Sequence, residues 1–275
     1  MKIIFKIAKI LLLIYVLFIG LLFLFQDKLL FHPQKIALEY IEPKYDDLRY
    51  DPYEEFYIKH KNGITINAQL IKSNFKSKGV IYYLHGNRGN IPAQKIDLPT
   101  YLDRGYDVFM IDYQGYGKSE GKPSKKALEE DVLLGFDFLK QKYSQDSIII
   151  LGHSMGSYPA TYCATKRKPK ALILMAPIYK VSDILKHKIP IFIPSFNFKN
   201  NLDNSALIDA ITCPAYIFIA KSDHLIPFKS SIKFKHHLNN KNTLTIAKRA
   251  GHNNMVGDKD VINKLNIILG QPNKI

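Results

Sequence analysis

Ser147-Ile148-Ile149-Ile150-Leu151-Gly152-His153-Ser154-Met155-Gly156 is the stretch that decides the fold of this 275-residue chain. Its first half is an apolar run, which is typical of a buried strand. Its second half has the pattern Gly-x-Ser-x-Gly, and helix-compatible residues follow. A turn this abrupt strains the serine backbone, and side chains at positions 152 and 156 would meet neighbouring backbone. The stretch therefore predicts a strand–turn–helix unit that presents Ser154 as a nucleophile.

Similar apolar runs recur along the chain, and helical patterns separate most of them. Strands are expected at 79–84, 107–111, 148–151, 171–175, 215–219 and 242–246, after a hairpin of 54–59 with 65–71. Helices are expected at 93–104, 125–142, 154–166, 228–239 and 260–269. This alternation predicts a mostly parallel central sheet with helices on both faces. Ligands of such sheets bind at the carboxyl ends of the strands.

Two of these strand ends carry an acid and a base. Asp223 follows the strand expected at 215–219, and His252 follows the one at 242–246. The chain order Ser154, Asp223, His252 is that of the α/β-hydrolase arrangement. In that chemistry His252 accepts the serine proton and returns it to the leaving group, while Asp223 fixes the tautomer of the imidazole.

Other residues could fill these roles. Asp183, after the preceding strand, is the alternative acid, and His224 is the alternative base. Because His224 adjoins Asp223 in the same loop, the pair more simply lies side by side. No spacing of histidine, cysteine or carboxylate residues predicts a metal site, and the chemistry needs no cofactor.

Residues 85–87 follow the first parallel strand and predict part of an oxyanion hole. Acyl transfer builds negative charge on an oxygen, and two backbone amides directed at it stabilise the transition state. We expect the amides of Asn87 and Met155 to serve, with Gly86 or Arg88 in place of Asn87 if the register differs by one residue.

The N-terminus predicts a membrane anchor over residues 1–28. Every residue from Ile10 to Phe25 is apolar or aromatic except Gly20, and Lys6 and Lys9 can snorkel to lengthen the span. A cleaved signal peptide is the alternative, but no small-x-small cleavage site follows the run. The lysines before the span predict a single-pass membrane protein with a cytoplasmic N-terminus and the catalytic domain on the exterior or periplasmic side.

The remaining chain divides into a connector at 29–53 and a catalytic domain at 54–275. Within that domain, residues of about 177–204 break the alternation with prolines and aromatic residues, which predicts a lid over the pocket. Phe192, Phe196 and Phe198 are its candidate substrate-binding residues. A connector that packs into the core is the alternative interpretation.

Composition excludes several classes of partner. The formal net charge is +15, but the lysines are scattered and no RNA-binding or zinc-finger pattern accompanies them, so we expect no nucleic-acid partner. We also expect the protein to be a monomer. The two cysteines, Cys163 and Cys213, are expected to be buried apolar residues rather than a disulfide.

The motifs together resemble a known family. Residues 85–90 (His-Gly-Asn-Arg-Gly-Asn), residues 112–121 (Asp-Tyr-Gln-Gly-Tyr-Gly-Lys-Ser-Glu-Gly) and residues 152–156 are similar to the Bem46-like branch of the α/β-hydrolase superfamily, which overlaps the serine aminopeptidase S33 domain family. The resemblance implies a Ser-Asp-His hydrolase, with relatives that remove acyl chains from lipids or proteins. Ala220-Lys221 stands where relatives often have His-Gly, and Gln114 where an arginine is common, so substrates cannot be transferred from relatives.

These observations favour a membrane-anchored serine esterase or thioesterase that acts on lipophilic acyl groups. A serine peptidase of the aminopeptidase type is the alternative, although it would need acidic groups for a substrate amine, and the lid offers only Asp183 and Asp203. A non-catalytic binding protein on the same scaffold is the third possibility.

Overall fold

An eight-stranded sheet with strand order β10-β9-β8-β7-β4-β6-β3-β2 forms the centre of the molecule. The computed structural model describes residues 1–40, 53–188 and 199–273. The strands of this sheet are β2 (Tyr53–Lys59), β3 (Thr65–Ile71), β4 (Val80–Leu84), β6 (Asp107–Ile111), β7 (Ile148–His153), β8 (Ala171–Met175), β9 (Ala215–Ala220) and β10 (Asn242–Ala247). The hairpin β2–β3 is antiparallel and joins β6 antiparallel, whereas all other neighbours are parallel. The predicted mostly parallel sheet is therefore confirmed.

The uninterrupted apolar strands arise because each faces two cores. In β7, Ile148 and Ile150 belong to one hydrophobic cluster, while Ile149 and Leu151 belong to the other. Successive side chains of a strand point to opposite faces, so a strand covered on both sides needs apolar residues at every position. Cys163 and Cys213 are buried free thiols, as expected.

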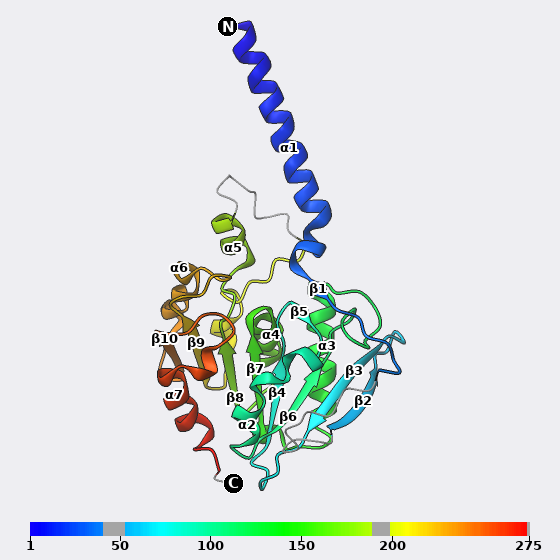
Figure 1. Ribbon diagram of the computed structural model, residues 1–275, viewed down its shortest axis with the longest axis vertical. Coiled ribbons are helices and arrows are strands. Elements are labelled where there is room, and N and C mark those ends of the chain that lie inside the picture. Colours follow the sequence, from blue (N-terminus) through cyan, green and yellow to red (C-terminus); the bar gives the residue numbers. More distant parts are fainter. Residues whose placement is uncertain (41–52, 189–198, 274–275) are drawn as a thin grey trace.

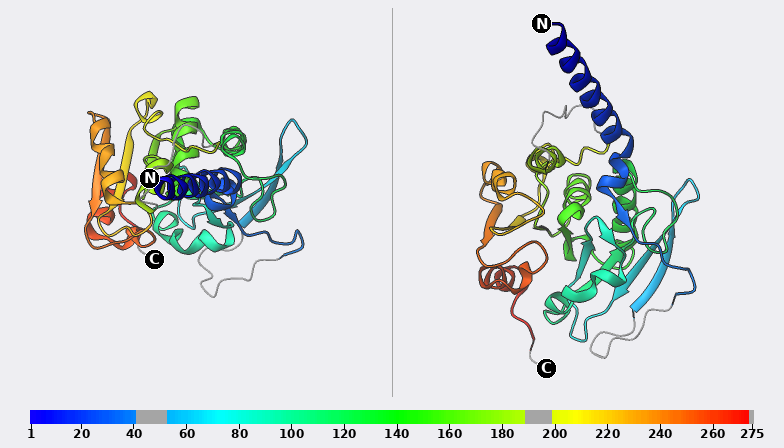
Figure 2. Two further views of the ribbon diagram at one scale, coloured as in Figure 1. Left: turned by 90° about the horizontal axis from the view of Figure 1, so that it is seen from above. Right: turned by 45° about the horizontal axis from the view of Figure 1, so that its top comes forward.

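Helices cover both faces of the sheet, as Figures 1 and 2 show. One face carries α3 (Lys125–Leu139), α4 (Ser157–Lys166), α6 (Phe228–Ser231) and the 3₁₀ helix η6 (Ile232–His237), and the other carries η2 (Pro92–Asp97), α2 (Pro99–Leu102) and α7 (Lys259–Leu269). The prediction of continuous helices at 93–104 and 228–239 was wrong in detail, because each is divided into a 3₁₀ segment and a short α-helix. Pro99 has no amide hydrogen to donate to the preceding turn, so the first of them is a 3₁₀ segment followed by a four-residue helix.

The N-terminal helix α1 (Lys2–Leu30) projects from the domain (Figure 1). It is long and apolar enough to cross a membrane by length and composition, so it is a candidate membrane anchor. Its end is joined firmly to the domain. Phe31 is buried in the core, and β1 (His32–Pro33) pairs with β5 (Arg88–Gly89) in a separate two-stranded sheet. The start of the predicted connector at 29–53 is thus ordered structure, and its residues 41–52 lie outside the described chain.

Candidate active site

Ser154 lies in a strained turn between β7 and α4. Its backbone φ is 54°, in a region that non-glycine residues rarely occupy. A Cβ atom on Gly152 would come within 2.5 Å of the Gly156 carbonyl oxygen, and one on Gly156 within 2.1 Å of the Leu84 carbonyl oxygen. Both glycines are therefore required by close backbone contacts, as the sequence predicted, and the turn fixes where the serine side chain lies.

Asp223 and His252 meet in the loops after β9 and β10. His252 Nδ1 is 2.7 Å from Asp223 Oδ2, and both side chains are buried. The other carboxylate oxygen, Asp223 Oδ1, accepts hydrogen bonds of 2.8 Å from the amides of Leu225 and Ile226. Burial alone would raise the pKa of Asp223, but these hydrogen bonds and the His252 ring outweigh it and hold the pKa below its usual value. The acid is thus ionised and oriented toward the imidazole.

The alternative acid and base lie elsewhere. Asp183 accepts hydrogen bonds of 2.8 Å from Ser230 Oγ and Lys233 Nζ, and so is already paired with other residues. His224 is exposed. Of the four acid and base candidates, the structure brings only Asp223 and His252 into contact with each other.

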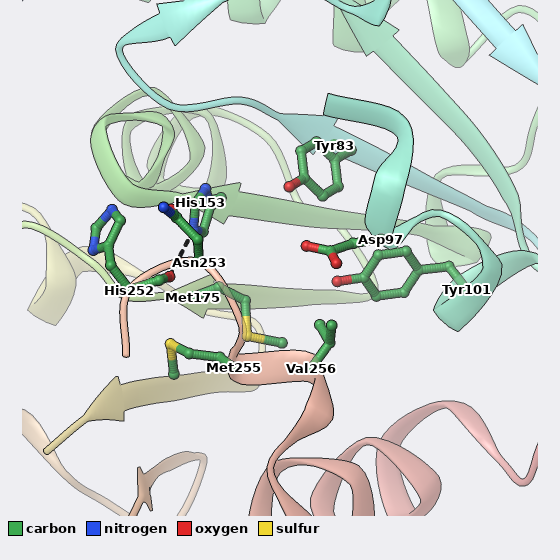
Figure 3. A pocket seen from close by; sticks show the side chains of 9 residues that line it. All are labelled: Tyr83, Asp97, Tyr101, His153, Met175, His252, Asn253, Met255 and Val256. Carbon is green, nitrogen blue, oxygen red and sulfur yellow. Dashed lines mark hydrogen bonds between the residues drawn. The ribbon is translucent and has the colours of Figure 1, made fainter. Parts of the chain in front are cut away.

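His153, the residue before Ser154, lies next to the His252 loop (Figure 3). His153 Nε2 lies 3.3 Å from the His252 carbonyl oxygen, and the two imidazole rings are 5.2 Å apart. Burial, with the neighbouring His252, lowers the pKa of His153 to about 4, so its ring is neutral near pH 7. Among the hydrogen bonds of the described residues, none joins the Ser154 hydroxyl to the His252 ring. In ligand-free sites such bonds are often long and shorten when substrate binds.

Two cavities flank these residues. The one in Figure 3, between His252, His153, Asp97 and Tyr101, has a volume of about 10 Å³, which is room for a single water molecule. The other has a volume of about 660 Å³ and is lined by Ser154, so it is the one that can hold a substrate.

Asn87 and Met155 line the large cavity together with Ser154. The Asn87 carbonyl accepts hydrogen bonds of 2.9 Å from the His32 amide and from the Tyr116 hydroxyl, which fixes the peptide that carries the amide of Arg88, one of the two alternative donors. Gly86, the other alternative donor, lies close to the serine: a Cβ atom on Gly86 would be 3.4 Å from Ser154 Cβ. The loop therefore brings amides to the serine, and which of them binds an oxyanion stays a prediction.

Only part of the predicted lid lies within the described residues. The helix α5 (Val181–Lys188), inside the predicted lid, contributes to the wall of the large cavity. Phe192, Phe196 and Phe198, the candidate substrate-binding residues, lie outside the described residues. Gln114 is buried and donates from both its backbone and its side-chain amide to Asp131, so the departure from the family pattern at this position lies away from the cavity.

The large cavity also contains residues that sequence reasoning missed. Leu22, Gln26, Leu29 and Leu30 of α1 form part of its wall. In the apolar run of this helix no periodicity marks one face. Gln26, a polar residue directly after that run and 8% exposed, is the signal that could have indicated it. Across the described ranges, no cluster of three or more histidine, cysteine or carboxylate residues could hold a metal ion.

Known proteins share this architecture. The family model described as serine aminopeptidase, S33, matches residues 76–209. The esterase Pf2001 of Pyrococcus furiosus superposes with a TM-score of 0.67 at 19% identity, over 88% of this chain and 95% of that one. The chain has the α/β-hydrolase fold.

Proteins of similar sequence include lipases. The chain is 31% identical over 173 residues to a lysophosphatidylserine lipase (ABHD12) of Macaca fascicularis, covering 56% of this chain and 44% of the relative. It is 30% identical over 184 residues to the protein of the same name in Danio rerio, covering 59% and 48%. The chain thus spans about half the length of the curated relatives that it matches.

Proposed function

We propose that this protein is a membrane-anchored serine hydrolase that cleaves carboxylic esters or thioesters of lipophilic acyl groups. The observation that carries the proposal is that Ser154, held at a positive φ of 54°, lines a cavity of about 660 Å³ together with Leu225 and Ile226, whose amides bind Asp223 of the buried Asp223–His252 pair. The lipase names of the sequence relatives support the same reaction class.

In the proposed mechanism, Ser154 Oγ attacks the substrate carbonyl carbon while His252 Nε2 accepts the hydroxyl proton. The negative charge on the carbonyl oxygen is stabilised by the amides of Met155 and of Asn87, with Gly86 or Arg88 as the alternatives to Asn87. His252 then protonates the leaving alcohol or thiol, and an acyl-serine remains. Water, deprotonated by His252, hydrolyses this ester and restores the enzyme. Asp223 keeps the proton of His252 on Nδ1 and stabilises the imidazolium formed in each half of the cycle.

The cavity lining favours a substrate in which an apolar acyl group is attached to a neutral or anionic leaving group. Most of its described side chains are leucine, isoleucine or valine, and its charged residues are Arg88 and Lys188. No acidic side chain lines the described part of the cavity, whereas an aminopeptidase needs such a group to bind the substrate's ammonium ion. We therefore favour esters, single-chain anionic lipids included, over peptides. By the positive-inside argument from Lys2, Lys6 and Lys9, the catalytic domain faces the exterior side of the membrane.

The reaction class can be tested on the full chain in nonionic detergent. A fluorophosphonate probe should label the wild type and fail to label Ser154→Ala of equal folded content, because the probe modifies an activated serine. Absence of labelling in folded wild-type protein would contradict the hydrolase proposal and favour the non-catalytic alternative.

The substrate class needs a second assay. Among p-nitrophenyl acetate, octanoate and palmitate, kcat/KM should rise with chain length, because the cavity is apolar. A preference for acetate would contradict the lipophilic part of the proposal. Release of amino acids from short peptides, without ester hydrolysis, would replace it by the peptidase alternative.

A further inference from the structure

The last turns of α1 carry an apolar stripe that faces the large cavity. Leu22, Gln26 and Leu29 follow one another at intervals of four and three residues, which places them on one face of the helix. Leu24, by contrast, is 73% exposed and points away from the domain. The anchor helix therefore has two faces where it meets the domain, one toward Ser154 and one toward its surroundings.

The helix α5 supplies another wall of the same cavity. Val181, Ile184, Leu185 and Lys188 line the same cavity at intervals of three, one and three residues, again one face of a helix. Both α1 and α5 stand at the end of the domain from which α1 projects (Figures 1 and 2). The walls of the cavity are thus two helix faces, and Ser154 lies among the domain residues at its base.

Specific contacts hold α1 in this place. The Asn200 side chain donates to Asp27 Oδ1, and the Asn87 side chain donates to the Leu30 carbonyl at 2.9 Å. Gln26 Oε1 accepts a bond of 3.4 Å from the Asn200 amide, which explains a buried glutamine in an apolar helix. The position of the α1 wall is therefore set by the domain and is not that of a loose tether.

The length of α1 agrees with a double role. The helix has 29 residues, and a membrane-spanning helix needs about 20. If the segment before Leu22 crosses the bilayer, the remaining turns stand at its surface and form the cavity wall. The apolar environment of the bilayer then continues along α1 into the cavity.

Resting on the proposed hydrolase function, we propose that α1 and α5 together form an acyl-chain groove that opens toward the membrane. The occupant is the acyl chain of a lipid from the leaflet next to the domain. It moves along α1 with its ester toward Ser154, so that no methylene group has to cross water. Leu22 and Leu29 on α1, with Ile184 on α5, are then specificity-determining residues for acyl length. Arg88 and Lys188 are the charged residues that line the same cavity and could bind an anionic headgroup.

The groove is tested by narrowing and widening it in the full chain, reconstituted in phosphatidylcholine vesicles. Leu22→Trp should lower the ratio of kcat/KM for p-nitrophenyl palmitate to that for octanoate by at least about tenfold, because the indole fills the groove. Leu22→Ala should shift the ratio in the opposite direction. The matched control is Leu24→Trp, two residues along on the exposed face, which should leave the ratio at the wild-type value.

An unchanged ratio in both Leu22 variants, or an equal shift in Leu24→Trp, would overturn the groove. Labelling by a short fluorophosphonate monitors folding of every variant. If the wild type hydrolyses no ester of any length, the proposed function fails. If it hydrolyses these esters but the ratio of kcat/KM for palmitate to that for octanoate is the same in the Leu22 variants, only the present inference fails.

The membrane route has its own test. A fluorogenic long-chain monoacyl ester that does not exchange between vesicles is placed either in the vesicles that hold the enzyme or in separate ones. Hydrolysis should be at least about tenfold faster in the shared vesicles, since the lipid reaches the groove within one bilayer. Equal rates would overturn access from the membrane.

Discussion

The two sides of the Ser154 cavity are built in different ways. On the domain side, the turn at Ser154 follows a central strand of the sheet, and added Cβ atoms on its glycines would lie within 2.5 Å of backbone oxygens. On the other side, α1 is mostly exposed along its length and is held by Phe31, a few hydrogen bonds and the short β1–β5 ladder. The first side is rigid because close-packed interiors leave no room for displacement.

This difference separates reaction from selectivity. Changes on the domain side should abolish turnover whatever the acyl group, because they displace the reacting atoms. Changes on the α1 side should alter which esters react, because they reshape a wall that the reaction itself does not use. The following variants test that separation.

The largest effect is expected from Asp223→Asn. The asparagine keeps the shape but cannot hold His252 in the reactive tautomer or stabilise its imidazolium, so kcat for p-nitrophenyl acetate should fall about 10⁴-fold. The fall in kcat is measured by steady-state hydrolysis, and circular dichroism monitors folding.

Asp183→Asn is the matched control, since Asp183 was the alternative acid and is paired with Ser230 and Lys233. Its acetate turnover should stay near that of the wild type. If the large loss occurs in Asp183→Asn instead, the acid has been assigned to the wrong residue.

The next effect is expected from Gly156→Ala. The new methyl group would lie 2.1 Å from the Leu84 carbonyl oxygen and 2.5 Å from that of His85, neither of which can move without breaking the β4 loop. The free energy of unfolding should fall by about 4 kcal/mol or more, with activity lost for every ester. Thermal denaturation in detergent measures this loss.

Gly257→Ala is a suitable control for that experiment, because a Cβ atom added to Gly257 would meet no atom within 4 Å. Its stability should change by less than about 0.5 kcal/mol. Equal losses in the two variants would show that the close contact at the turn does not govern stability.

The contrast between the two sides also explains what could be predicted from the sequence. The turn and the strands around it follow from local rules: a strand between two cores must be apolar at each position, and a strained strand–helix turn must have glycines at 152 and 156. The pairing of Asp223 with His252 follows from the parallel sheet, because consecutive parallel strands end at the same edge. These features can be predicted from residue patterns alone.

The α1 wall could not be predicted in this way. An apolar helix is compatible with a bilayer and with a protein cavity. Its composition therefore predicts the anchor but does not indicate which face packs against the domain. Apart from the polar Gln26, it is contacts from distant positions, such as Asn87 and Asn200, that identify that face. The predicted donor Asn87, with Gly86 and Arg88 as alternatives, stays a prediction; its loop leads into β5, which pairs with β1.

Phe31→Ala tests how firmly the α1 wall is held. Phe31 is 3% exposed and connects α1 to the core, so its truncation should lower the free energy of unfolding by about 3 kcal/mol. It should also raise KM for palmitate more than for acetate, because the wall shifts while the serine stays in place. Phe25→Ala, where the ring is 48% exposed, is the control and should change neither quantity. An equal rise of KM for both esters would mean that the two sides are not separable.

The smallest effect is expected at Asp112, which begins the loop whose Gly117 bonds to Gln34 and Ile36 just after β1. Asp112 Oδ1 accepts a 2.9 Å hydrogen bond from the Ile91 amide, and burial raises the pKa of this carboxyl to about 7. In the unfolded chain such a carboxyl ionises near pH 4, at about its ordinary value. Between these two values the folded protein binds a proton that the unfolded chain has released, so stability falls as the pH rises.

Asp112→Asn cannot ionise and should escape this loss. Relative to the wild type, its free energy of unfolding should increase by about 2 kcal/mol between about pH 5 and about pH 8, measured by urea denaturation in detergent at each pH. Any hydrogen bond lost to the amide adds an offset that does not depend on pH, so the slope isolates the ionisation. Curves that run parallel across this range would mean that Asp112 ionises alike in both states. In that case its burial would not destabilise the loop on which the α1 side of the cavity rests.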